Sequence, residues 1–280
     1  MAVSAKMVRD LREMTGAGMM DCKKALEATG GDLDAAVDHL RKSGLKSAEK
    51  KAARTMGEGR VHAFIEDGGR RGSMVLLSCE TDFVAKTEDV TRFLESLAAQ
   101  VLEGNPASSG ALLNQPWEGG GTVEEALKSL IGKLGENMSI GGYARLENRE
   151  GWIGSYIHHD NRQSAMVAVT TPAPREQAEP LLKALCQHIV VYSPACVSRD
   201  EVPDEVIERE KEIYREEVQG KPENIQEKIL AGKLEKYYAG IVLPEQPWIH
   251  DDKTTVAQAL VAELGEGTRV KGFAHFKVGG

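Results

Sequence analysis

The sequence lacks the features of several classes of protein. No run of about 18 apolar residues occurs, and residues 1–14, MAVSAKMVRDLREM, lack the basic start, apolar centre and small-residue cleavage site of an export signal. We therefore expect a cytoplasmic protein with no membrane partner. Cysteine is scarce, and Cys22, Cys79, Cys186 and Cys196 show no CxxC spacing. The sequence thus indicates buried, reduced thiols instead of a zinc site or a disulfide framework.

An excess of basic charge is also absent. The 280 residues carry 35 basic and 43 acidic side chains, and the formal net charge of -8 opposes binding to a phosphate backbone. We therefore expect no direct nucleic-acid partner. The local exception is residues 41–54, RKSGLKSAEKKAAR, where six basic residues stand against one acidic residue. This basic strip is compatible with a solvated linker helix and with a docking strip for an acidic partner.

Motifs for catalysis and cofactor binding are missing as well. Residues 16–24, GAGMMDCKK, do not have the spacing of a phosphate-binding loop, and no G-x-S-x-G motif occurs. His158 and His159 are adjacent, but no third metal ligand stands at a plausible spacing. We expect no cofactor, no metal site and no enzymatic activity. An enzyme that uses Asp82 and His158 is kept as an alternative for experiment.

Three helical patterns fill the start of the chain. Ser4 is placed to cap the first helix, whose apolar stripe includes Met14, and Asp32 is placed to cap the third. Ser43 and Gly44 are expected to end that third helix. We predict a three-helix module over residues 1–44, similar to ubiquitin-associated domains, followed by a basic linker helix over residues 45–57.

The segment after the linker occurs twice. EGRVHAFIEDGGRRGSMVLLS, starting at Glu58, aligns without a gap with EGWIGSYIHHDNRQSAMVAVT, starting at Glu150. Each copy reads as a strand, a polar turn, a second strand and a helix. The sequence therefore predicts an α+β fold with a duplicated core, whose related halves cover residues 58–141 and 142–280.

The two copies differ after their second strand. The first continues with CETDFVAK, residues 79–86, whereas the second has only residues 170–173 before its helix, which is about four residues fewer. A connecting loop normally carries few large apolar groups, because loops run over the surface. Phe83 therefore either folds back onto its own core or enters a partner, and the residues alone leave both alternatives open.

The second half is interrupted by two charged helical patterns. They cover residues 203–219 and 223–238, and Gly220 and Pro222 enforce a turn between them. We predict an antiparallel coiled-coil hairpin at about residues 200–240, with Val206 and Ile213 on the apolar side of its first helix. A helix over residues 255–264 and a strand over residues 269–278 are expected to complete the chain.

Several long motifs resemble bacterial elongation factor Ts. They are LREMTGAGMMDCKKAL at residues 11–26, ETDFVAK at residues 80–86 and AGKLEKYYAG at residues 231–240, and the resemblance extends along essentially the full chain. It implies a guanine-nucleotide exchange factor that binds elongation factor Tu with GDP through the G domain and a second surface. It also implies that Thr81, Asp82, Phe83 and Val84 dislodge magnesium from that GTPase and so promote GDP release, after which GTP can bind.

The resemblance implies further contacts with elongation factor Tu. They are made by Arg12, Met19, Met20, Lys23, Lys51, His158, Ile249 and His250. Met19 and Met20 at their tight turn are either an exposed apolar knob or partly buried under the bundle. Asn161 stands where the family commonly has Gly, and we expect it to adopt the left-handed turn. The oligomeric state stays open between a homodimer and a two-plus-two complex, and an adaptor that binds a partner without nucleotide exchange is the alternative function.

Overall fold

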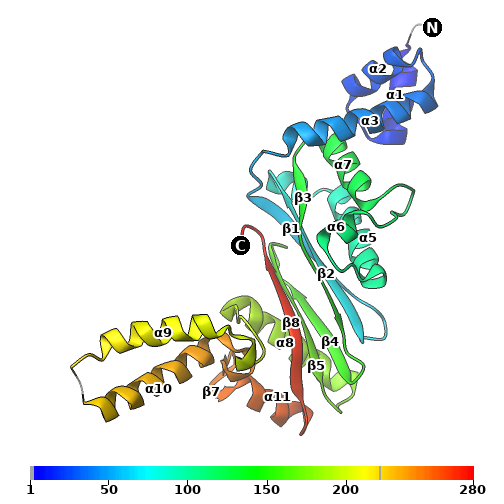
Figure 1. The fold of residues 1–280 in the computed structure, drawn as a ribbon. Helices are drawn as coiled ribbons and strands as arrows, with labels where there is room; N and C mark the ends of the chain where they lie inside the picture. The colour runs from blue at the N-terminus through cyan, green and yellow to red at the C-terminus, as the bar shows by residue number, and fades with distance from the viewer. Residues whose placement is uncertain (1–2, 221) are drawn as a thin grey trace. The chain divides into compact units, whose positions relative to one another are not determined.

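The computed structural model describes residues 3–220 and 222–280, and the side chains of residues 45–50 and 224 fall outside that description. The chain divides into two compact units, one of residues 1–62, 74–144 and 277–280 and the other of residues 63–73 and 145–276. Both contain helices and strands (Figure 1), which confirms the α+β class. None of the helices in the described part is long and apolar enough to cross a membrane.

The first unit begins with a three-helix module. Its helices are α1 (Ala5–Thr15), α2 (Met19–Ala28) and α3 (Leu33–Lys51). The Ser4 hydroxyl accepts a hydrogen bond from the Met7 amide at 3.2 Å, as predicted, and Gly16 ends α1 in the left-handed region. The module has its own small core of Val8, Leu11, Cys22, Ala25, Leu26 and Ala36.

The prediction that the third helix ends at Ser43 and Gly44 is wrong. Helix α3 continues through both residues to Lys51. Gly44 lies against Gly132 of α7 (Val123–Leu134), where a Cβ atom built on Gly132 would be 2.8 Å from the Cα atom of Gly44. Glycine here permits a close crossing of two helices instead of ending one. The side chains of Lys46 and Lys50, part of the predicted basic strip, lie outside the described residues.

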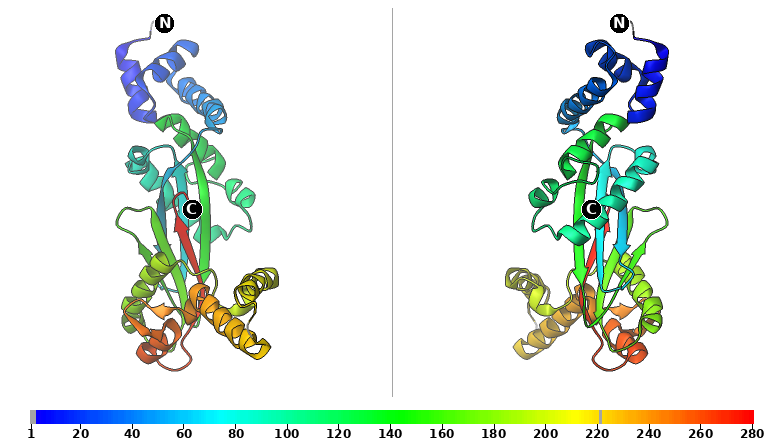
Figure 2. Two further views of the ribbon diagram at one scale, coloured as in Figure 1. Left: turned by 90° about the vertical axis from the view of Figure 1, so that its left-hand side faces the viewer. Right: turned by 90° about the vertical axis from the view of Figure 1, so that its right-hand side faces the viewer.

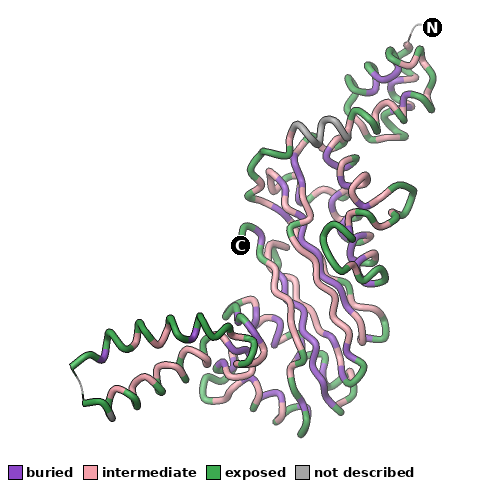
Figure 3. The backbone as a smooth tube through the Cα atoms, in the orientation of Figure 1, coloured by how far each residue is buried: buried purple, intermediate pink, exposed green. Residues whose placement is uncertain are grey.

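The rest of the first unit packs helices on the greater part of a three-stranded sheet of order β1-β2-β3. The strands are β1 (Glu58–Ile65), β2 (Arg71–Cys79) and β3 (Met138–Glu147); the helices are α4 (Asp82–Ala85), α5 (Glu88–Gly104), α6 (Ser109–Leu113) and α7. Strand β3 was not predicted. The core between them includes Val75, Leu77, Leu94, Leu97 and Val101. Figure 3 shows buried segments along the strands and along the helices that face them.

The second unit contains the sheet of order β4-β5-β8. Its elements are β4 (Gly151–Ile157), β5 (Gln163–Thr170), α8 (Arg175–Tyr192), β6 (Pro247–Trp248), β7 (Asp251–Thr255), α11 (Val256–Leu264) and β8 (Arg269–Lys277), with 3-10 helices at Arg199–Glu201 (η1) and Leu243–Glu245 (η2). The antiparallel register of β4 and β5 runs from Gly151 opposite Thr170 to Ile157 opposite Ser164. The helix and strand predicted near the end of the chain are confirmed by α11 and β8.

The repeated segments adopt matching backbone conformations. A Cβ atom on Gly59 would lie 2.3 Å from the carbonyl oxygen of Leu77, and one on Gly151 would lie 2.0 Å from that of Val169. Each glycine therefore permits the neighbouring strand to approach closely. The turns also match, because Gly69 and Asn161 have φ values of 65° and 56°. Asn161 thus adopts the left-handed turn that we expected.

The difference between the copies is present in the structure. Eight residues, 80–87, connect β2 to α5, whereas four residues, 171–174, connect β5 to α8. The additional residues form the short helix α4, which contains Phe83. The second copy forms the same hairpin followed by a helix without these residues, so the insertion is not required for the fold.

The predicted hairpin is formed by α9 (Asp204–Glu217) and α10 (Glu223–Ile241), which lie side by side in Figures 1 and 2. Val206 and Ile213, which we expected on the apolar packing side, are exposed, so that assignment is wrong. Ile207 is buried instead, on the helical stripe that contains Tyr214, whose ring lies 5.0 Å from the Lys233 ammonium of α10. Coiled-coil packing between the two helices stays a prediction.

Candidate functional site

Residues 81–84 lie in the short connection that distinguishes the two copies. Thr81 caps α4, and its hydroxyl accepts a hydrogen bond from the Val84 amide at 3.4 Å. Ala85 is buried and Val84 packs partly against the first core, whereas Phe83 is 81% exposed. The alternative in which Phe83 folds back onto its own core is therefore wrong. The turn is anchored on one side and presents an unpacked ring on the other.

Asp82 lies beside that ring and is held by one lysine. The Lys86 ammonium donates to the Asp82 carboxylate at 2.6 Å. This hydrogen bond is the main reason that the pKa of Asp82 is lowered from its ordinary value. The carboxylate is consequently ionised at neutral pH. The site thus combines a large apolar surface with an exposed negative charge.

The turn rests on buried and polar groups beneath it. The thiol of Cys79 donates to the carbonyl oxygen of Thr81 at 3.1 Å, and burial raises the pKa of this thiol to about 11. A protonated, buried thiol is not a nucleophile. The amide and hydroxyl of Thr81 donate to the two carboxylate oxygens of Glu136 at 3.0 and 2.7 Å. Glu136 was missed by the sequence analysis because it stands 55 residues away along the chain.

The predicted contact residues of the module are on its surface. Arg12 lies on α1, and Met19, Met20 and Lys23 lie on α2; all four are exposed. Of the two alternatives for the methionines, the exposed knob is therefore confirmed. Lys23 forms an exposed ion pair with Glu27 at 3.8 Å, which contributes little to stability.

Met14 is a further exposed methionine at the end of α1. We expected it on the inward stripe of that helix, but it is 61% exposed. Val8 and Leu11 are the residues of α1 that pack into the module core. Helical spacing predicted an apolar stripe on α1, but it did not predict that the residues of the stripe are exposed near the end of the helix. Exposed methionines therefore stand on both sides of the tight turn at residues 16–18.

Lys51 is the last residue of α3 and is half-buried. Its charge contributes to the electrostatics of Glu80, which immediately precedes Thr81. The pKa of Glu80 is lowered mainly by the hydrogen bond from the Asn137 amide, then by Arg54, with a smaller effect of Lys51. The end of α3 is thus electrostatically linked to the start of the turn that contains Phe83.

The remaining predicted residues lie in the second unit. His158 follows β4, and its Nδ1 atom is 3.1 Å from the hydroxyl of Tyr156. Ile249 packs partly against the second core, whereas His250 is exposed and lies edge-on to Trp248, with ring centroids 5.4 Å apart. The structure therefore distributes the predicted residues over several elements of two units. Residues 81–84 form one continuous turn, and Met19, Met20 and Lys23 share α2.

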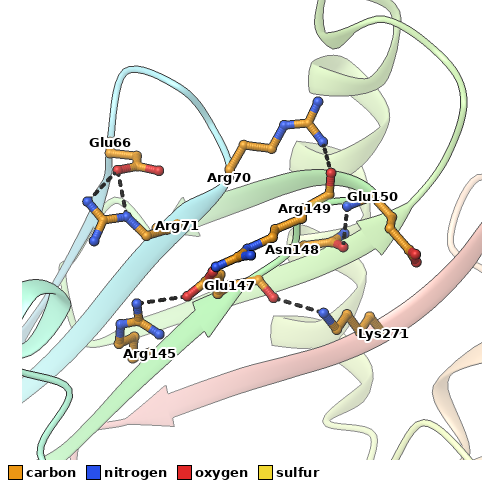
Figure 4. A network of polar contacts seen from close by, with 9 residues as sticks. All are labelled: Glu66, Arg70, Arg71, Arg145, Glu147, Asn148, Arg149, Glu150 and Lys271. Carbon is orange, nitrogen blue, oxygen red and sulfur yellow. Dashed lines mark hydrogen bonds and ion pairs between the residues drawn. The ribbon is translucent and has the colours of Figure 1, made fainter.

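Figure 4 shows a polar network in the second unit, outside residues 81–84. The Arg70 guanidinium donates to the carbonyl oxygen of Arg149 at 2.6 Å. It also donates to the carbonyl oxygen of Gly151 at 3.0 Å, and its carbon lies 4.1 Å from the Trp152 ring centroid. Glu147 accepts from the side chain of Arg149 at 3.0 Å. These groups form hydrogen bonds with one another, and the bonds stabilise the turn between β3 and β4. Within the described residues, no group of three or more His, Cys, Asp and Glu side chains could hold a metal ion.

Comparison with known proteins matches the full length of the chain. A family model described as "Elongation factor TS" matches residues 80–280, and one described as "UBA/TS-N domain" matches residues 3–40, which confirms the predicted module. The proteins named "Elongation factor Ts" from Prosthecochloris aestuarii and Aquifex aeolicus are 42% and 40% identical to this chain. The alignment with the Prosthecochloris aestuarii protein covers 99% of this chain and 99% of that protein. The alignment with the Aquifex aeolicus protein covers 100% of this chain and 99% of that protein. The Clostridium botulinum protein of that name is 40% identical, over 99% of this chain and 93% of its own.

Proposed function

This chain belongs to the elongation factor Ts family, and on that premise we propose that it is the guanine-nucleotide exchange factor of elongation factor Tu. In this proposal it binds elongation factor Tu with GDP, dislodges the magnesium ion and promotes GDP release, so that GTP can bind. It acts in the cytoplasm, performs no covalent chemistry of its own and holds no cofactor.

The exposed ring of Phe83 is the observation that carries the proposal. Burying a phenylalanine side chain is favourable by about 1.5 to 3 kcal/mol relative to leaving it in water. The isolated chain does not gain this free energy, because the ring of Phe83 is exposed. A groove between two helices of the GTPase would recover that free energy on binding. The ring would then hold the two helices apart, as a wedge, for as long as the complex lasts.

Displacing those helices weakens the magnesium site. The phosphates of GDP rely on the ion as their main counter-charge, so GDP binds less tightly once the ion is lost. Asp82 brings a carboxylate to the same neighbourhood, and its negative charge repels the phosphates of GDP once it separates from the Lys86 ammonium. Ring insertion and charge repulsion thus act in the same direction.

Exchange by this route is a coupling between two ligands of one GTPase. The factor and GDP weaken each other's binding by the same ratio, and each tenfold of coupling corresponds to about 1.4 kcal/mol. The factor needs no preference for GTP, because cellular nucleotide concentrations set the direction. It also needs no nucleotide site of its own.

We assign the remaining contacts by matched family position. Arg12, Met19, Met20 and Lys23 of the module dock on the G domain, and Lys51 at the end of α3 makes a further contact with elongation factor Tu. Exposed methionines suit this role, because their flexible, polarisable side chains adapt to an apolar surface. His158, Ile249 and His250 of the second unit also contact elongation factor Tu.

Release of fluorescent GDP from purified elongation factor Tu tests this function. The wild-type chain should accelerate release, and Phe83→Ala and Asp82→Ala should each slow it, the former by about tenfold to a hundredfold. Phe64→Ala is the matched control, since Phe64 is an exposed phenylalanine outside the turn. Binding without accelerated release would instead support the adaptor that lacks exchange activity, and turnover of a small molecule without the GTPase would support an enzyme.

A further inference from the structure

Two dipeptides far apart in the sequence exchange hydrogen bonds beneath Phe83. The Glu136 carboxylate accepts from the amide and hydroxyl of Thr81 at 3.0 and 2.7 Å. In return, the Glu80 carboxylate accepts from the amide of Asn137 at 2.6 Å. Hydrogen bonds to a carboxylate are stronger than those between neutral groups. We call this reciprocal arrangement of Glu80, Thr81, Glu136 and Asn137 the clasp.

The clasp also reaches the chain that leaves α3. The buried side-chain amide of Asn137 donates to the carbonyl oxygens of Ala52 and Arg54 at 3.4 and 3.1 Å. The Arg54 guanidinium donates back to the Glu80 carboxylate at 3.2 Å. Three segments of the first unit therefore meet at one point: the end of α3, the start of α4 and the connection from α7 to β3.

The turn needs such support from outside. Helix α4 has four residues, and a single helical turn is not stable on its own in water. The ring of Phe83 is exposed and receives little orientation from its own packing. Its direction is consequently set by the backbone of residues 81–85, whose first residue is held by Glu136.

We propose that Glu136 and Asn137 are positioning residues for nucleotide exchange, an inference that rests on the proposed function. The clasp keeps the turn ordered before the partner is met, so that inserting Phe83 requires no further ordering of the backbone. It also connects the turn to the end of α3, the helix that belongs to the docking module. Neither residue touches the partner's magnesium site; both act through Phe83.

Hydrogen exchange in the free chain tests the first step. Glu136→Ala should speed exchange of the amides of residues 81–86 by about tenfold, because the turn loses its charged acceptor. Glu136→Gln keeps one acceptor oxygen and should restore part of the protection. Glu118→Ala, which removes an exposed acidic side chain elsewhere in the first unit, should change nothing.

A double-mutant cycle on GDP release tests the second step. Glu136→Ala should lower the maximal release rate by about tenfold in the wild-type background and have little effect beside Phe83→Ala, because both changes act on one wedge. Equal effects in both backgrounds, or unchanged exchange of residues 81–86, would overturn the positioning role alone. A wild-type chain that fails to accelerate release would overturn the proposed function, and with it any role of the clasp in exchange.

Discussion

Two phenylalanine side chains near the candidate site have opposite environments. Phe83 is 81% exposed, whereas Phe93 on α5 is 7% exposed and lies 5.2 Å from the Trp117 ring, centroid to centroid. An exposed ring adds little to the stability of the free chain, because unfolding does not change its contact with water. A buried ring adds both transfer free energy and packing. Phe83 is therefore available for a partner without loss to the fold.

The pair yields a direct comparison of stability. We expect Phe83→Ala to leave the free energy of unfolding nearly unchanged and Phe93→Ala to lower it by about 3 to 5 kcal/mol. Urea unfolding of both variants against the wild type measures the difference. A loss in Phe83→Ala as large as that in Phe93→Ala would mean that the ring packs inside its own chain.

Helices α3 and α7 cross at a pair of glycines, and the two positions are not equivalent. A Cβ atom on Gly132 would come within 2.8 Å of the Cα atom of Gly44, which is closer than real atoms approach. A Cβ atom on Gly44 would lie 3.7 Å from the Cα atom of Gly132, an ordinary contact distance. The separation of the two helices is therefore limited by Gly132 and not by Gly44.

Alanine should have different effects on thermal stability at the two positions. Replacing glycine by alanine within a helix is worth about 1 kcal/mol in helix propensity, whereas forcing a methyl group into a closed contact costs about 1 to 3 kcal/mol. Gly44→Ala should thus raise the thermal midpoint or leave it unchanged, and Gly132→Ala should lower it. Calorimetry of the two variants measures this; equal shifts would show that the helices do not cross at this distance.

At the root of the helical hairpin, one arginine joins three elements. Arg199 of η1 donates to Glu235 of α10 at 2.6 Å and to Glu245 of η2 at 2.7 Å. Its guanidinium carbon also lies 4.4 Å from the centroid of the Tyr238 ring. Bidentate pairing of this kind orients α10 relative to the neighbouring 3-10 helices within the second unit.

The pH response of the whole chain should depend on a buried histidine. His188 of α8 is fully buried, its Nε2 atom is 2.9 Å from Oε1 of Gln246, and its ring stacks on Trp248 with centroids 5.5 Å apart. Burial is the main reason that the pKa of His188 is lowered from its ordinary value of 6.5; the bond to Gln246 opposes this, and His250 adds to it. The folded chain therefore holds this imidazole neutral.

The lowered pKa of His188 makes the folded chain less stable at acidic pH. Below pH 6.5 the unfolded chain binds a proton at His188 that the folded chain does not bind, so stability falls as the pH drops through that value. We expect urea unfolding to show a loss from about pH 7.5 to about pH 5.5 that is smaller in His188→Gln. Part of the loss will remain, because burial also lowers the pKa of His62. Equal pH slopes in both proteins would contradict this role of His188.

Local chemistry allowed much of this architecture to be predicted from the sequence. Capping by Ser4, the left-handed turn at Asn161 and the insertion before α5 each act within one helix end, one turn or one connection. Such effects depend on residues a few positions apart or on the nearest strand. The repeat, the helical module and the position of the inserted turn therefore followed from the chain alone.

Only the tertiary structure decided which apolar groups are covered and which distant polar groups meet. Periodicity predicted apolar stripes, but Met14 and Val206 are exposed because the neighbouring helices cover other residues of the same helices. Gly44, expected to end a helix, instead lies inside α3, where it faces Gly132 of α7. Glu136 meets Thr81 across 55 residues, a contact that no local propensity encodes. Residues 81–84 could thus be identified from the sequence. The hydrogen bonds that hold them, such as those from Thr81 to Glu136, depend on how the chain packs around the turn.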